Sequence, residues 1–251
     1  MDPTPPDSAA ELSPEELAEH RAEVLDLLRR GENKLFVQRS EELEVVGLDL
    51  RGMDLRGRDL RGAYLVAANM RGALLELTQL QGAMMEDVDL RETMLRGNDL
   101  SGAALSGAEL DRAMLDGANL RNCDMECTAL TEARLQGADL RNAKIVGADL
   151  SGADLRRADL RGIITGGFVT GGVWVETTAL STDFREADLR EVELVGDYDG
   201  ADFRGADLRK LFIARARIRR GRFAGARMEG LRVLEIDITG SDIDLANQAP
   251  D

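Results

Sequence analysis

The stretch GADLSGADLRRADLRG, residues 147–162, repeats nearly the same five residues three times. Leu150, Leu155 and Leu160 stand five apart, and each follows an Ala-Asp pair. A helix repeats near 3.6 residues and a strand at 2, so neither accounts for this spacing. The spacing extends well beyond the stretch, because all 23 positions at multiples of five from Leu50 to Leu160 hold Leu, Met or Ile. A period of five therefore decides the fold of this chain.

Each apolar fifth residue has regular neighbours. The residue two positions before it is usually Ala, the residue one before it is often Asp or Asn, and the residue two after it is often Gly. This pattern resembles the A(D/N)LxX consensus of the pentapeptide-repeat family over most of the chain. The resemblance implies an all-β solenoid, a right-handed quadrilateral β-helix in which each pentapeptide forms one side of a square coil. It also implies that the central Leu and the small residue two before it point inward.

The physics of stacking agrees with this fold. Gly or Asn just after each side allows a tight turn. One repeat buries almost nothing alone, so stability comes from stacked neighbours. Coils joined by backbone hydrogen bonds stack about 4.8 Å apart, and counting sides along the chain predicts about ten coils in a rod roughly 48 Å long.

The repeat is expected to change in three places. Residues 163–177, IITGGFVTGGVWVET, keep the spacing of five but place Thr165 and Thr170 at the centres. One-residue deletions are expected near residues 181–184 and 195–198, because the next apolar centre comes after only four residues. Each of these places predicts a kink or a bulged corner. Either drift of the repeat or a purpose-built loop would explain the Gly-rich segment.

The N-terminal residues lie outside the repeat. Residues 1–12 form an acidic, Pro-rich tail that we expect to be disordered. Residues 13–46 are expected to form a helical cap, which a solenoid needs to close its open end. Ser13-Pro14-Glu15-Glu16 is a capping box with Pro at the first helical position, and Gly31 ends the helix. We expect a helix over residues 14–30 and a second element over 33–44.

The C-terminal end shows no such helix. The β-helix is assigned to residues 47–245 and a short tail to residues 246–251. Leu231 and Ile236 occupy inner positions that are small elsewhere. These side chains either plug the end or meet a second copy, so a homodimer through the C-terminal coil is one expectation.

Composition restricts the class of partner. The chain carries 47 acidic and 32 basic residues, a net charge of −15. Nucleic-acid-binding proteins and anionic membrane surfaces both call for basic patches, so direct binding to either is not expected. No apolar run approaches the ~20 residues of a transmembrane helix, and the acidic N-terminus is unlike a signal peptide. We therefore expect a cytoplasmic protein.

Residues that carry out catalysis or bind metal ions are scarce. The two cysteines, Cys123 and Cys127, do not form a CxxC pair and have no histidine near them, whereas a metal site needs more ligands. The only histidine, His20, lies in a polar segment expected to be helical. The sequence contains no nucleophile motif, phosphate loop or paired-carboxylate signature. It therefore predicts no enzyme activity, no metal site and no cofactor.

Some outward positions hold apolar residues instead of polar ones, and these are the candidate binding positions. With four sides to a coil, residues twenty apart stack on one face. One face then carries an outward apolar stripe of Leu74, Met94 and Met114, joined by Leu77. An exposed apolar patch marks an interface or a surface that another segment covers, so either a partner binds there or the N-terminal segment folds over it. A second outward apolar group is expected at Ile164, Val169 and Trp174.

These observations favour a non-catalytic, rigid scaffold that binds a protein partner through exposed apolar surface. The alternative follows from the resemblance, because quinolone-resistance members of the family resemble DNA and bind DNA gyrase. A rod of roughly 48 Å would need about 28 negative charges to match DNA, which carries one per ~1.7 Å. Residues 47–251 hold 35 acidic and 27 basic residues. The charge density is therefore too low for close mimicry, and topoisomerase protection remains the second hypothesis.

Overall fold

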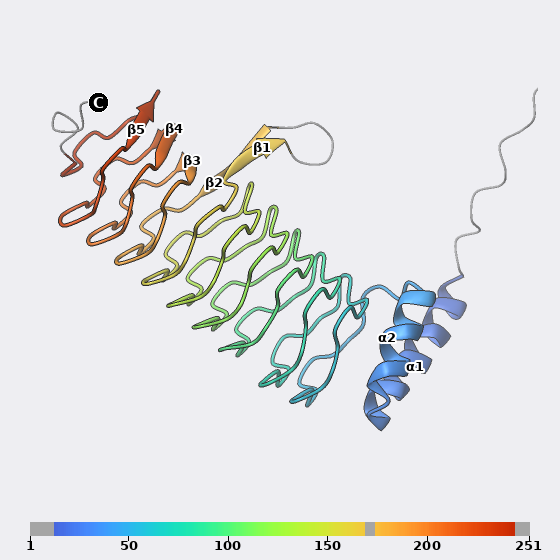
Figure 1. Cartoon of the computed structure of the whole chain (residues 1–251). Coiled ribbons are helices and arrows are strands. Elements are labelled where there is room, and N and C mark those ends of the chain that lie inside the picture. The colour runs from blue at the N-terminus through green and yellow to red at the C-terminus, as the bar shows by residue number, and fades with distance from the viewer. Residues whose placement is uncertain (1–12, 169–173, 244–251) are drawn as a thin grey trace, which may run out of the picture.

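The chain forms a rod of stacked coils with two helices at one end (Figure 1). The computed structural model describes residues 13–168 and 174–243. Each side of a coil ends in a tight turn, as where the backbone N–H of Ala63 donates to the carbonyl of Leu60 at 3.1 Å. The same turn recurs every five residues, which explains the period of the sequence. Within the described ranges no helix is both long and apolar enough to cross a membrane.

Neighbouring coils are joined by parallel β-bridges between residues twenty apart. Asp89 bridges Glu109, and the N–H of Leu90 donates to the carbonyl of Glu109 at 2.8 Å. We name the four sides by their first bridged residues, so side 1 begins at Asp49, side 2 at Asp54, side 3 at Asp59 and side 4 at Tyr64. The row on side 1 continues to Arg217, which bridges Asp237. The number of coils stays a prediction, because the described residues end at residue 243.

The core is a column of the central apolar residues. Leu50, Leu100 and Leu150 are all buried, and so are most of the small residues two positions before the centres, such as Ala103. The inward and outward positions are therefore those expected from the repeat. Larger side chains replace leucine toward the C-terminus, where Phe203 stacks between two other phenylalanines. The ring centres of Phe184 and Phe203 are 4.9 Å apart, and those of Phe203 and Phe223 are 5.0 Å apart.

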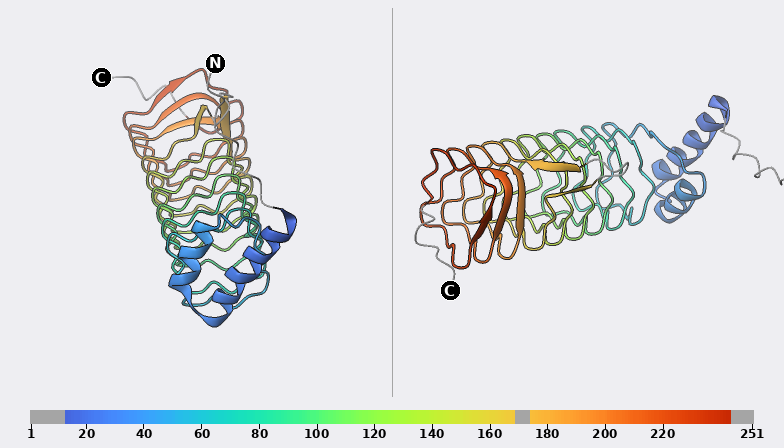
Figure 2. Two further views of the ribbon diagram at one scale, coloured as in Figure 1. Left: turned by 90° about the vertical axis from the view of Figure 1, so that its right-hand side faces the viewer. Right: turned by 90° about the horizontal axis from the view of Figure 1, so that it is seen from above.

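The two helices close the N-terminal end of this column. α1 (Pro14–Arg30) begins with the expected capping box at Ser13, and Gly31 ends it in the left-handed conformation at φ 81°. α2 (Asn33–Glu42) ends two residues before the boundary expected from the sequence. Val24, Leu28 and Phe36 are fully buried and belong to the same core as Leu48 and Leu50. Figure 2 shows both helices lying across the end of the rod.

A hairpin leaves the rod where the Gly-rich segment begins. β1 (Gly166–Phe168) pairs antiparallel with β2 (Trp174–Thr178). The stack resumes when Thr178 bridges Asp149, 29 residues away instead of 20. The hairpin thus accounts for nine added residues, and the side rows continue unbroken beyond it.

The expectation that residues 163–177 keep the spacing of five was wrong. Thr165 is a buried centre as expected, but the next centre is Ala179. The other expected centre, Thr170, lies outside the described residues. The glycines permit the departure, because a Cβ on Gly166 would meet the side chain of Val195 at 2.8 Å. The segment is therefore an insertion and not a drifted repeat.

Three further strands cross the corner between sides 4 and 1. β3 (Glu193–Asp197), β4 (Phe212–Arg217) and β5 (Arg232–Leu234) pair in parallel, and the five strands lie in the order β1-β2-β3-β4-β5. The register shifts between Leu194 and Gly196, where β3 has one residue fewer than β4. This is the one-residue deletion expected near residues 195–198.

The deletion expected near residues 181–184 was wrong. Ala179 is fully buried and stands five residues before Phe184, so the spacing there is regular. Leu180, four residues before Phe184, is the centre that an unbroken spacing of five predicts, and it is exposed. The error followed from the undetected hairpin, because nine added residues shift the phase of the repeat by one position.

Candidate partner-binding surfaces

The apolar stripe, Leu74, Leu77, Met94 and Met114, lies on side 2 and its corner. Leu74 bridges Asp54, and Met94 bridges Met114. Met94 is 42% exposed, while Leu74 and Met114 are half-buried. Methionine adapts its shape to a contact better than branched residues do. The structure therefore places these four residues together, as an accessible strip of adaptable apolar side chains.

Leu77 is the most exposed member of the stripe. It is 84% exposed and adopts the left-handed conformation at φ 62°. The neighbouring coils place Gly57, Gly97 and Gly117 at the same corner. Glycine takes this conformation without strain, whereas another L-residue costs roughly 1 kcal/mol. Folding gives no reason for an exposed leucine at this corner.

The ladder between coils is interrupted beneath the stripe. Among the described residues Leu74 and Met94 form no bridge with each other, although Leu74 bridges Asp54 before it and Met94 bridges Met114 after it. Asn98 is buried at an inner position that usually holds Ala, and its Nδ2 donates to the carbonyls of Leu75 at 2.7 Å and Thr78 at 3.3 Å. The side-chain amide of Asn98 thus occupies two carbonyls of the preceding coil at this interruption.

Sequence reasoning missed this interruption, although a signal was present. Thr93 and Asn98 stand at two consecutive inner positions where the repeat normally has Ala. The hydroxyl of Thr93 donates to the carbonyl of Leu90 at 2.6 Å. Thr93 and Asn98 therefore place two buried polar side chains next to each other in the coil of Met94.

The described helices do not cover the stripe. Their polar contacts reach the first coil, where Arg21 Nε donates to the carbonyl of Val46 at 2.9 Å and the N–H of Tyr64 donates to Ser40 Oγ at 3.3 Å. Both contacts lie at the end of the rod. Residues 1–12, the rest of the N-terminal segment, lie outside the described residues.

The second expected group is divided by the hairpin. Ile164 remains on side 4 and is 49% exposed. The rule that residues twenty apart stack on one face predicts Trp174 above Asp154 on side 2, but Asp154 bridges Asp183 instead. The insertion moves Trp174 onto β2, where its Nε1 donates to Glu176 at 3.1 Å. Val169 lies outside the described residues.

The C-terminal end of the rod is apolar. Leu231 is buried and Ile236 half-buried at the inner positions where the sequence indicated large residues. Val233 and Leu234 are exposed on the last strand. No helix is found at this end among the residues up to 243.

Asp–Arg pairs cover much of sides 2 and 3. Arg161 Nε donates to Asp159 Oδ1 at 2.9 Å, and its Nη2 donates to Oδ2 at 2.6 Å. Arg161 also lies 3.5 Å from Asp188 of the next coil. The arginines that pair with the Asp two positions before them in the same way are Arg51, Arg56, Arg61, Arg91, Arg141, Arg156, Arg185, Arg190, Arg204 and Arg209.

The pairing holds the carboxylates ionised and neutralises them. Hydrogen bonds from Arg51 lower the pKa of Asp49 to about 2. Burial alone would raise the pKa of Asp202, but hydrogen bonds from Arg204 and the charge of Arg222 hold it below its usual value. The acidic rows thus present alternating charges, unlike the uniform negative charge of a DNA backbone. This surface does not favour charge mimicry of DNA.

The four-sided stacked coils define this chain as a repeat solenoid, in which each coil contacts only its neighbours. The chain belongs to the pentapeptide-repeat family. The family model described as "Pentapeptide repeats" matches in eight copies, with matches over residues 46–78, 59–97, 73–111, 90–126 and 123–162. A search of curated proteins gives no match.

Solved structures of other pentapeptide-repeat proteins are similar to this chain. HetL from the cyanobacterium Nostoc sp. strain PCC 7120, involved in heterocyst differentiation regulation, is 26% identical over 82% of this chain and 91% of its own, with a TM-score of 0.42. Rfr23 from the cyanobacterium Cyanothece 51142 is 28% identical over 51% and 92% of the two chains, with a TM-score of 0.20.

A plasmid-mediated fluoroquinolone resistance protein, QnrB1, is also similar. Its full-length structure is 17% identical over 80% of this chain and 94% of its own, with a TM-score of 0.25. At these TM-scores none of the three likenesses carries an argument about function.

Proposed function

We propose that this protein is a non-catalytic scaffold that binds a protein partner through the apolar stripe. The observation that carries the proposal is Leu77, a large aliphatic side chain held exposed in a strained backbone conformation. Among the described residues other than glycine, it is the only large apolar one that adopts a positive φ. An apolar side chain displayed at a cost to folding is best explained by a contact that it makes elsewhere.

The surroundings of Leu77 support a protein contact. Arg96 and Arg134 both lie near Asp116, with distances of 3.1 and 3.2 Å. These charges border the strip of Leu77 and Met94, which gives the apolar-centre, polar-rim arrangement of protein interfaces. The rigid framework keeps the stripe in one geometry, which lowers the entropy cost of binding.

The test is a capture experiment with purified protein and extract of the source cell. A double variant, Leu77→Gly with Met94→Glu, should lose the captured partner, because it removes the two most exposed members of the stripe. The matched control is Leu180→Glu, which alters an exposed leucine outside the stripe. If the double variant and the control retain the same partner as the natural sequence, the stripe is not the binding surface.

Self-association through the C-terminal coil is a second part of the proposal. Val233 and Leu234 leave exposed apolar area at this end. Light scattering on a size-exclusion column should show a dimer that Leu234→Asp converts to a monomer. A monomer for the natural sequence at micromolar concentration removes this part and leaves the stripe proposal intact.

A further inference from the structure

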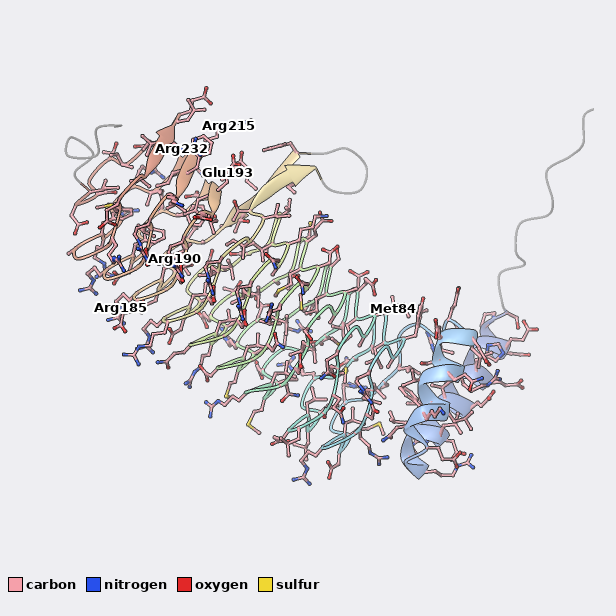
Figure 3. All side chains as sticks on the ribbon, in the orientation of Figure 1. Met84, Arg185, Arg190, Glu193, Arg215 and Arg232 are labelled. Atoms are coloured by element: carbon pink, nitrogen blue, oxygen red, sulfur yellow. The ribbon has the colours of Figure 1, made fainter. Side chains whose placement is uncertain are left out.

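The outer surface of the β2–β5 sheet differs from the rest of the rod. Side 4 continues there through Ile164, Glu193, Phe212 and Arg232. Figure 3 shows Glu193, Arg215 and Arg232 along the edge formed by β3, β4 and β5, away from Arg185 and Arg190. We define the sheet patch as Ile164, Trp174, Phe212, Arg215, Arg232 and Leu234. None of these residues belongs to the apolar stripe.

Two cation–π contacts organise the sheet patch. The guanidinium carbon of Arg215 lies 5.2 Å from the ring centre of Trp174, and that of Arg232 lies 4.9 Å from the ring centre of Phe212. Both distances fall within the ~6 Å range of an attractive contact. A guanidinium that stacks by its face keeps the N–H donors at its edge available. The rings therefore fix the positions of the two cations and leave donors for a ligand.

These two arginines differ from the arginines of the Asp–Arg rows. No carboxylate of the described residues lies within 4.0 Å of the guanidinium of Arg215 or Arg232. On the same strand as Arg215, Arg217 pairs with Asp197. Arg215 takes the left-handed conformation at φ 48°, at the corner position that recurs every five residues and for which β3 has no counterpart. This corner displays a cation that has no carboxylate partner among the described residues.

Apolar area surrounds these cations. Leu234 is 52% exposed and Trp174 is 39% exposed. An arginine beside an exposed tryptophan is a frequent centre of protein–protein binding energy. In a chain with a net charge of −15, this combination selects a partner of opposite charge to the patch.

We propose that the sheet patch binds an acidic segment of a partner protein. Carboxylates of the segment accept hydrogen bonds from Arg215 and Arg232, and a Leu or Phe side chain of the segment packs against Trp174. Charge-assisted bonds of this kind set the position of the segment. The site shares no residue with the apolar stripe, so it does not depend on the stripe proposal, although it shares Leu234 with the C-terminal surface proposed for self-association.

The borders of the patch favour a peptide over a nucleic acid. Three glutamates stand beside residues of the patch: Glu193 pairs in register with Phe212, Glu176 accepts a hydrogen bond from Trp174, and Glu235 directly follows β5. A nucleic acid carries a phosphate at every step and would bring some of them against these carboxylates. A peptide can place neutral residues there. The patch is also small and mixed in charge, unlike a continuous basic groove.

The chain offers a direct readout, because Trp174 is its only tryptophan. The probe is a short peptide of alternating Glu and Leu, titrated into the full-length protein while the tryptophan emission is recorded. The matched probes are a Lys–Leu peptide and a single-stranded oligodeoxynucleotide. We expect the Glu–Leu peptide to change the emission and to bind at least roughly tenfold more tightly than either of the others.

Variants assign the binding to the patch. Arg215→Gln should weaken binding of the Glu–Leu peptide roughly tenfold, since it removes a charge-assisted hydrogen bond. Arg217→Gln is the control, because it changes the net charge by the same amount on the same strand. Glu193→Gln should strengthen binding by removing a repulsive carboxylate. Circular dichroism confirms that each variant is folded.

Three results overturn the proposal. The first is equal binding of the Lys–Leu peptide, or no emission change with the Glu–Leu peptide. The second is oligodeoxynucleotide binding as tight as that of the Glu–Leu peptide, which assigns the patch to nucleic acid. The third is equal loss in Arg215→Gln and Arg217→Gln, which reduces the effect to net charge.

Discussion

The coils over residues 48–160 and the coils over residues 179–243 follow one period but are built differently. In the first region the centres are mainly leucines, and the coils join through single bridged residues at each side. In the second region phenylalanines stack through the core, and strands of three to six residues cross a corner. The same repeat therefore tolerates two kinds of core and two kinds of corner.

The difference shows where the repeat can change without disrupting the stack. Outward positions change freely, as the apolar stripe does in the first region. Inward positions accept single changes such as Met85 or Asn98, whereas the large rings of Phe184, Phe203 and Phe223 occur together and stack on one another. Both surfaces that we assign to partners lie at such departures, one in each region.

The largest expected effect tests the two cores. Phe203→Ala should lower the free energy of unfolding by about 3–5 kcal/mol, because it removes a ring that stacks on both neighbours. Leu115→Ala in the first region should cost about 2–5 kcal/mol and fall below Phe203→Ala. Urea unfolding followed by circular dichroism measures both. If Leu115→Ala lowers the free energy of unfolding by more than Phe203→Ala does, the stacking of the phenylalanine rings adds no stability to the second region.

The next effect tests the two kinds of corner. Gly196 has φ 131°, and a Cβ there would lie 2.0 Å from the carbonyl oxygen of Thr177. Gly196→Ala should therefore lower the free energy of unfolding by at least about 2 kcal/mol. The new Cβ forces the backbone at Thr177 to move, and alanine is also strained at this φ. Gly97 has φ 65° and open space around it, so Gly97→Ala should cost about 1 kcal/mol. Equal costs for the two variants, measured by thermal unfolding, would falsify the close approach of β2 and β3.

As the pH falls, residues 179–243 should unfold before residues 48–160. Bound arginines hold the pKa of Asp207 and Asp202 below their usual values, so the unfolded chain binds more protons than the folded chain. The stability from these pairs is complete above about pH 4 and is lost as the pH falls further. Asp202 is the best shielded of these carboxylates, because its side chain is 5% exposed and three arginines lie within 4.0 Å of it. In the first region the side chain of Asp89 is 14% exposed and that of Asp154 is 23% exposed, and Asp49 is more exposed still, so water screens these pairs more.

Hydrogen exchange read by mass spectrometry between about pH 5 and pH 2 separates the regions. We expect residues 179–243 to lose protection at a higher pH than residues 48–160. Asp202→Asn should reduce the acid sensitivity of the second region while lowering its stability at neutral pH. Simultaneous loss of protection in both regions contradicts this difference.

The smallest effect is expected at the apolar stripe. Leu77→Gly removes the strain of a positive φ but increases the entropy of the unfolded chain, so the free energy of unfolding should change by less than about 1 kcal/mol. Thermal unfolding measures it. A loss well above this value would mean that Leu77 serves folding, and the main argument for a binding role would fail.

Most of the fold could be predicted because its cause is local. Short motifs such as Ala-Asp-Leu determine both the turn every five residues and the leucine at each centre. The helix at residues 14–30 was equally local, with a capping box at Ser13 and a glycine at Gly31. The hairpin was not predictable in this way, because Thr165 and Thr170 stand five apart like two centres of the repeat. The chain instead leaves the stack there, and β1 pairs with β2.

The candidate surfaces were predicted in part for the same reason. Positions twenty apart placed Leu74, Met94 and Met114 in one row, which needs only the period. The contact of Arg232 with Phe212 also needs only the period, because the two residues stand twenty apart. The contact of Arg215 with Trp174 needed three-dimensional packing, because the hairpin brings Trp174 against a strand that is remote in the sequence. The interruption beneath the stripe depended on the side chain of Asn98 and not on spacing.

The ladder of bridged coils has a mechanical consequence. Its backbone hydrogen bonds run along the length of the rod, so a pull on the two ends loads the bonds of one coil boundary at a time. Because each coil contacts only its neighbours, extension should release one coil, about twenty residues, in each step. The boundary between Leu74 and Met94 has fewer such bonds than its neighbours. Under tension the rod should part first beside the apolar stripe.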